Sequence, residues 1–160
     1  MEISELGEMV RAELEDENLW DKAYDNDKKE WYLNTLELIR NRFHTLTDFA
    51  TLGRAYFADD FKVEEKPLKK NVLKHEGLVE WLPVLADRYE QLEQFNLEET
   101  ERVAREYADE LEIKPGILIN GMRTVVTGQL AGPSMFDILV SIGQKRVVNR
   151  LRDVAKLYPR

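Results

Sequence analysis

The 160-residue sequence contains no cysteine, which excludes disulfide bonds, thiol catalysis and zinc–thiolate sites. Its two histidines, His44 and His75, are isolated and far apart, so neither a metal site nor a histidine-based catalytic triad is expected. No apolar run approaches the roughly 18–20 residues of a membrane-spanning helix, and the N-terminus lacks a signal-peptide pattern. We therefore expect a cytoplasmic protein whose own residues hold no metal ion or cofactor.

The few glycines are irregularly spaced and do not form a glycine-rich, phosphate-binding loop. Carboxylate pairs such as Glu98-Glu99 occur in acidic stretches that are typical of solvated surfaces. No nucleophile stands in a recognisable arrangement with a base. Catalysis by this chain alone is therefore not expected.

Positive charge is scarce in the first two thirds of the chain and concentrated in the last third. Residues 114–160 hold eight Lys and Arg against two Asp, a net charge of +6. Residues 1–113 hold 15 bases against 29 acids, a net charge of −14. Because binding responds to the field of the contacting face rather than to the average charge, the last third is a candidate surface for a polyanion.

Apolar residues recur with the 3.6-residue period of amphipathic helices along most of the chain. Residues 117–127 are rich in β-branched side chains, but Pro115 at a first-turn position and the helical surroundings favour a helix there as well. Asn96 and Glu99 form the pattern of a capping box. Further helices are expected from Ser4 to about residue 17, through residues 32–43, from Thr47, over 76–94, 133–143 and 144–157.

The pattern therefore predicts an all-α protein made of two stacked helical subdomains. We place the upstream, acidic subdomain at residues 1–95 and the C-terminal, basic subdomain at residues 96–160. The broken segments 58–75 and 94–97 are the two candidate junctions, because both interrupt the helical periodicity.

Residues suited to binding an unstacked RNA base lie in the basic last third. Arg123 offers a planar donor fork that fits the O2 and N3 acceptors of cytosine, and Pro133 offers a rigid, flat wall. Met135 and Phe136 offer an apolar shelf for stacking, as in other readers of single-stranded RNA. The residue pattern also allows Met135 and Phe136 to be core residues and Arg123 an ordinary surface residue.

Three runs in this region resemble the C-terminal anticodon-binding domain of bacterial-type glutamyl-tRNA synthetases. That family has Pro-Leu-Arg-x-Ala-Leu-Thr-Gly, then Pro-x-Leu-Phe-(Asp/Glu)-hydrophobic-Leu, then Gly-x-x-x-Val-x-x-Arg-Leu. This chain has Gly-Met-Arg-Thr-Val-Val-Thr-Gly at 121–128, Pro-Ser-Met-Phe-Asp-Ile-Leu at 133–139 and Gly-Gln-Lys-Arg-Val-Val-Asn-Arg-Leu at 143–151. Gly121 replaces the family's first proline, and Met135 replaces a leucine. Residues 42–49 and 55–57 extend the resemblance more weakly upstream.

The resemblance implies an all-α anticodon-binding fold and a tRNA(Glu) anticodon loop as the partner. By the resemblance, Arg123, Pro133, Met135 and Phe136 lie at the first anticodon base, and either Arg42 or Arg40 contacts the last base. Residues that would meet RNA phosphates, and so position the loop without specifying its sequence, are Lys145, Arg146, Arg150, Arg152 and Lys156.

Members of this family join glutamate to tRNA with ATP and Mg²⁺ in a separate catalytic domain. Its His-Ile-Gly-His-like and Lys-Met-Ser-Lys-Ser-like signatures are absent from this sequence. We therefore expect an inactive, monomeric C-terminal portion of a longer synthetase, joined in cis to that catalytic domain. Some members also charge tRNA(Gln), and the sequence leaves that choice open. The alternative function is a helical protein–protein scaffold with a basic docking face.

Overall fold

The computed structural model describes residues 1–159, which form helices joined by turns and loops, with no β-strand among them. The predicted all-α class is confirmed. None of the helices in this part of the chain is long and apolar enough to cross a membrane.

The chain divides into two compact units, Met1–Phe61 and Lys62–Arg160. This division differs from the predicted boundary at residues 95–96 and falls inside the other candidate junction, 58–75. The reason is packing: helix α6 (Leu78–Glu90) lies against helices α7 (Leu97–Leu111) and α10 (Gln144–Arg152) and so belongs with the C-terminal helices.

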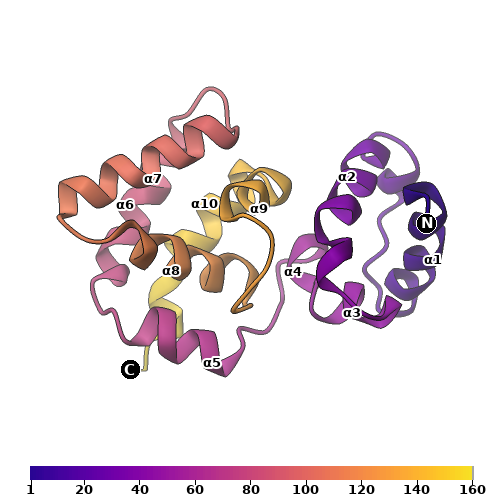
Figure 1. Cartoon of the computed structure of the whole chain (residues 1–160), viewed down its shortest axis with the longest axis horizontal. Helices are drawn as coiled ribbons and strands as arrows, with labels where there is room; N and C mark the ends of the chain where they lie inside the picture. The colour runs from indigo at the N-terminus through magenta and orange to yellow at the C-terminus, as the bar shows by residue number, and fades with distance from the viewer. Residues whose placement is uncertain (160) are drawn as a thin grey trace. The chain divides into compact units, whose positions relative to one another are not determined.

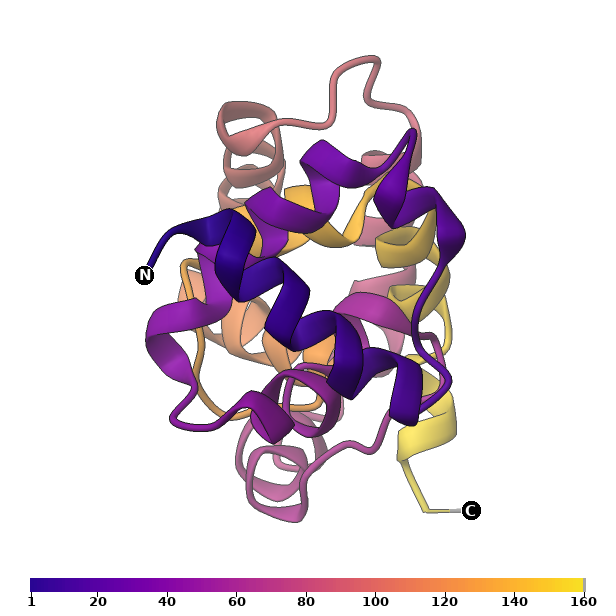
Figure 2. The same cartoon turned by 90° about the vertical axis from the view of Figure 1, so that its right-hand side faces the viewer.

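The first unit contains α1 (Ile3–Asp16), α2 (Lys29–Ile39), α3 (Leu46–Thr51) and α4 (Arg54–Phe57), with 3₁₀ turns at Lys22–Asp25 and Arg40–Arg42. Helix α1 packs on α2 and α3 (Figures 1 and 2). Its predicted apolar face is buried, since Leu6 is 8% exposed and both Val10 and Leu14 are fully covered. The unit is thus held by the hydrophobic stripe that the sequence predicted for its first helix.

Two details of this unit differ from the sequence prediction. Helix α1 begins at Ile3, with Glu2 rather than Ser4 at the N-cap position. The predicted stripe of residues 32–43 ends early, because α2 stops at Ile39 and Phe43 has an extended backbone. At the next helix, a capping box forms between Thr45 and Asp48, and the two backbone hydrogen bonds to the carboxylate lower the pKa of Asp48.

The second unit begins with α5 (Glu65–Pro67) and a π-helical turn (Leu68–Leu73), followed by α6 and α7. Helices α8 (Pro115–Thr127), α9 (Met135–Ile142) and α10 and a 3₁₀ turn (Val154–Leu157) complete it. Residues 117–127 are therefore helical, as predicted, with Pro115 in the first turn of α8. Figure 1 shows α10, in yellow, beside α6 and α8, on both of which it packs.

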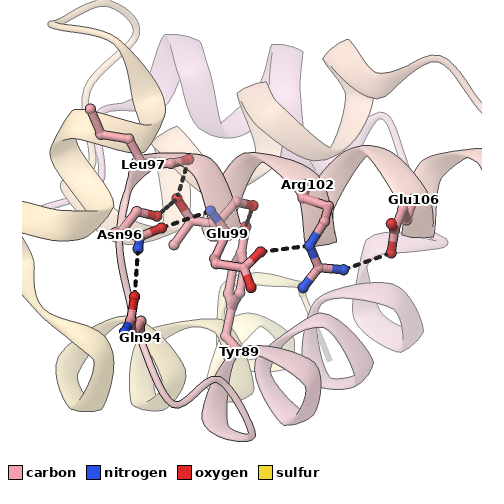
Figure 3. Close-up of polar contacts among 8 residues, drawn as sticks. Tyr89, Gln94, Asn96, Leu97, Glu99, Arg102 and Glu106 are labelled. Atoms are coloured by element: carbon pink, nitrogen blue, oxygen red, sulfur yellow. Dashed lines mark hydrogen bonds and ion pairs between the residues drawn. The ribbon is translucent and has the colours of Figure 1, made fainter.

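A local cap starts α7 where the sequence predicted it. Figure 3 shows the Asn96 side chain, whose Oδ1 accepts the Glu99 backbone N–H at 2.8 Å. The Glu99 carboxylate does not return to the cap but pairs with Arg102 at 2.6 Å. Below the cap, the buried Tyr89 hydroxyl donates to the Thr100 carbonyl at 2.9 Å and so joins α6 to α7.

Replacing Asn96 with alanine should lower the free energy of unfolding by about 1 kcal/mol, because the first turn of α7 loses its side-chain acceptor. Urea unfolding followed by far-UV circular dichroism measures this. The control is Glu93→Ala, at an exposed site just before the cap, for which a change below about 0.5 kcal/mol is expected. Equal losses in the two variants would show that the cap is not a significant source of stability.

Candidate nucleic-acid interface

Charge is distributed between the two units very unequally. The first unit holds 7 bases and 15 acids, whereas residues 62–160 hold 16 of each. The net charge of −8 therefore lies in the first unit, and the second unit is neutral overall. Its C-terminal basic residues are balanced by acids at positions 62–113, which include the acidic surface of α7.

Residues 121–128, the first of the three runs that resemble the synthetase family, form the end of α8 and the turn after it. Gly128 adopts a left-handed conformation with φ of 75°, and its N–H donates to the Thr124 carbonyl at 2.8 Å. Its own carbonyl accepts the Glu64 N–H at 2.9 Å, and a Cβ atom here would collide with the Lys62 backbone oxygen. The turn is thus tied to the segment that enters the unit, and only glycine fits there.

Arg123 forms a hydrogen bond across the loop between α8 and α9. Its Nη1 donates to the Pro133 carbonyl at 2.8 Å, which spans the loop between α8 and α9. Gly132 leaves room for this contact, because a Cβ atom there would lie 3.2 Å from the same nitrogen. At the helix end, the Thr127 hydroxyl donates to the Arg123 carbonyl at 2.7 Å and accepts the Gln129 N–H at 3.2 Å. Arg123 and Pro133 therefore do lie together.

The other two predicted base contacts lie inside the unit. Met135 is 2% exposed and Phe136 is 7% exposed, at the start of α9, which packs on α7, α8 and α10. These two side chains therefore form core, the alternative that the sequence left open. Contact of Arg123 and Pro133 with a base stays a prediction.

The predicted phosphate-binding residues do not form one exposed face. Arg150 is 8% exposed, so the prediction that it lies on the outer side of the last helix is wrong. The spacing of Arg150 instead indicates the buried side of the helix, because it follows Val147 by three residues and precedes Val154 by four, and both valines are buried. Because the residue is charged, the sequence prediction placed it on the surface.

Arg152 is exposed but engaged with carboxylates of α6. It forms two hydrogen bonds of 3.0 Å with Glu90 and one of 2.8 Å with Asp87, and this pairing lowers the pKa of Glu90. Lys156 pairs with Asp153 at 3.3 Å, while Lys145 is exposed and Arg146 is partly buried. Among the residues that the structure describes, Lys145 is thus exposed and forms no ion pair, which leaves it open to a phosphate.

Gln144 has a structural role that the sequence did not predict. Its Nε2 donates to the carbonyls of Tyr89 and Leu92, at 2.8 and 2.9 Å, and so caps the end of α6. No local pattern predicts a contact with carbonyls more than 50 residues away.

In the first unit, the two candidate arginines differ in their engagement. The guanidinium of Arg40 donates to the Met1 carbonyl at 2.7 Å and to Glu37 at 3.0 Å. Arg42, at the end of the 3₁₀ turn, is exposed. The geometry therefore favours Arg42 for contact with a partner. Across residues 1–159, no group of three or more His, Asp or Glu side chains is arranged to hold a metal ion.

Comparison with protein families gives a match along most of the chain. Residues 5–155 match the family described as anticodon binding domain. The chain is 66% identical to the glutamate–tRNA ligase of Desulfotalea psychrophila, over 99% of its own length and 32% of the relative's. It is 32% identical to the glutamate–tRNA ligase of Thermus thermophilus, over 94% of its length and 30% of the relative's.

A solved structure has the same fold. The glutamate tRNA ligase from Elizabethkingia meningosepticum, crystallised with its amino acid, superposes with a TM-score of 0.79 at 18% identity. The match covers 98% of this chain and 29% of that one. The chain thus spans about a third of the length of the proteins it resembles.

Proposed function

The chain belongs to the anticodon-binding domain family, and on that basis we propose that it is the tRNA-reading part of a glutamate–tRNA ligase. The observation that carries the proposal is the 66% identity to the Desulfotalea psychrophila ligase, which extends over 99% of the chain. Similarity at that level over a whole region supports the same partner and not merely the same fold.

In this proposal the second unit reads the first anticodon base and the first unit contacts the last base. Arg123 lies at the α8–α9 loop, where its planar donor fork can serve a base edge as well as the Pro133 carbonyl. Lys145 and Arg146 provide the phosphate contacts, and Arg42 is the candidate at the last base. Met135 and Phe136 are buried at the start of α9, directly after the loop.

The whole enzyme would join L-glutamate to tRNA(Glu), with ATP and Mg²⁺ bound by a catalytic domain linked in cis. We place it in the cytoplasm and infer that it acts as a monomer. The residues of this chain would bind and orient the anticodon loop, and the catalytic domain would carry out the chemistry.

The proposal predicts that this chain binds a tRNA(Glu) anticodon stem-loop in preference to an unrelated hairpin of the same length. Fluorescence anisotropy with labelled hairpins at low salt measures the preference, and a salt titration should show affinity falling linearly on a log–log plot. Equal affinity for both hairpins at low salt would refute anticodon reading by this chain. No binding to either would favour the protein–protein scaffold.

A further inference from the structure

The second unit contains an arginine that is inside the protein although it belongs to a basic run. Arg150 is 8% exposed in α10, three residues after the buried Val147 and four residues before the buried Val154 of the following 3₁₀ turn. Its Nη1 donates to the Val126 carbonyl of α8 at 2.7 Å. A buried guanidinium is costly unless it is well paired, so its location calls for a specific partner.

One such partner is the C-terminal end of α8. The last carbonyls of a helix lack intrahelical donors and carry the negative end of the helix dipole, which favours a cation. Val126 precedes Thr127, whose hydroxyl contacts both the Arg123 carbonyl and the Gln129 N–H. The guanidinium of Arg150 therefore fixes the turn from which the Arg123-braced loop starts.

Helix α10 is itself a fixed support for Arg150. Gln144, in its first turn, binds the carbonyls that end α6, and Arg152, in its last turn, binds Glu90 and Asp87 of the same helix. With both ends of α10 attached to α6, Arg150 holds the end of α8 at a defined position.

We propose that Arg150 is a positioning residue for anticodon reading: it holds the end of α8 and the Arg123 loop in place and does not contact RNA phosphate. The inference rests on the proposed function. Arg150, in the run 143–151, would thus position the loop, whereas Lys145 on the same helix would contact an RNA phosphate.

The test compares Arg150→Met, Arg150→Lys and Lys145→Met in the whole chain. Binding is measured by anisotropy, across a salt series, to the tRNA(Glu) stem-loop and to one altered at the first anticodon base. Arg150→Met should bind the matched loop about tenfold more weakly, because the loop would be in its binding conformation only about a tenth of the time, with little change for the altered loop and the same salt slope. Arg150→Lys, which can still reach a carbonyl, should recover part of the discrimination.

Lys145→Met is the matched control, because an exposed phosphate contact should weaken both loops alike and reduce the salt slope by about one. If Arg150→Met does the same, Arg150 is a phosphate contact and the inference is wrong. If Arg150→Met does not fold, Arg150→Lys decides: faster amide exchange in residues 124–134 with reduced discrimination supports positioning, and unchanged values of both refute it. A wild-type chain without preference for the stem-loop would instead refute the proposed function.

Discussion

Replacing Gly128 with alanine is expected to destabilise the second unit by about 2–4 kcal/mol, through backbone strain and a lost backbone hydrogen bond. The φ of 75° is unfavourable for any residue with a Cβ atom, and that atom would collide with the Lys62 carbonyl. The segment at 62–64 would have to move, which would break the bond from the Glu64 N–H to the Gly128 carbonyl. Urea unfolding measures the loss, and amide exchange of residues 62–66 locates it.

Two other glycines separate the causes. Gly143 has a φ of 100° but open space around the Cβ position, so Gly143→Ala should cost about 1–3 kcal/mol through strain alone. It should leave exchange at 62–66 unchanged. Gly116 lies in α8 with nothing nearer to a Cβ than Asn120 Nδ2 at 4.0 Å, and Gly116→Ala should stabilise by about 0.5–1 kcal/mol. If Gly128→Ala behaves like Gly116→Ala, the turn is not tied to the entering segment.

Local chemistry made most of the fold predictable from sequence. Pro115 at the first turn outweighed the β-branched content of residues 117–127, because a fixed φ suits a helix start and an isolated strand would have no partner. Asn96 predicted the start of α7, because its side chain can accept a backbone N–H of the first turn. The sequence offered 58–75 and 94–97 as junctions, but the choice between them could not be predicted this way, because it depends on α6 packing against α10, more than 50 residues later.

The candidate site was less predictable, because charge does not say where a side chain points. The run 143–151 contains Arg150, whose charge suggested a surface and whose spacing placed it on the buried side of α10. Arg152 was expected to be available to an RNA phosphate, but it forms ion pairs with Asp87 and Glu90. The sequence did place Arg123 and Pro133 at one site, whereas the hydrogen bond that joins them in the structure was not predicted.

Arg123→Ala is expected to weaken binding of the tRNA(Glu) stem-loop by about 1–3 kcal/mol and to relax the choice at the first anticodon base. The side chain supplies a planar set of donors, and one of them already fixes the Pro133 carbonyl at 2.8 Å. Its removal would take away the proposed base contact and also the hydrogen bond that holds the loop. Anisotropy measurements with the four possible first bases give the discrimination before and after the change.

Three variants separate base reading from charge. Arg123→Lys keeps the charge without the planar fork, so it should lose discrimination while the salt slope is unchanged. Gly132→Ala keeps Arg123 but places a methyl group 3.2 Å from its Nη1, and should reduce discrimination by displacing the guanidinium. Lys145→Ala should weaken all four loops equally, as loss of a phosphate contact does. If Arg123→Ala also weakens all four equally, Arg123 contributes only charge, and the first base is read elsewhere.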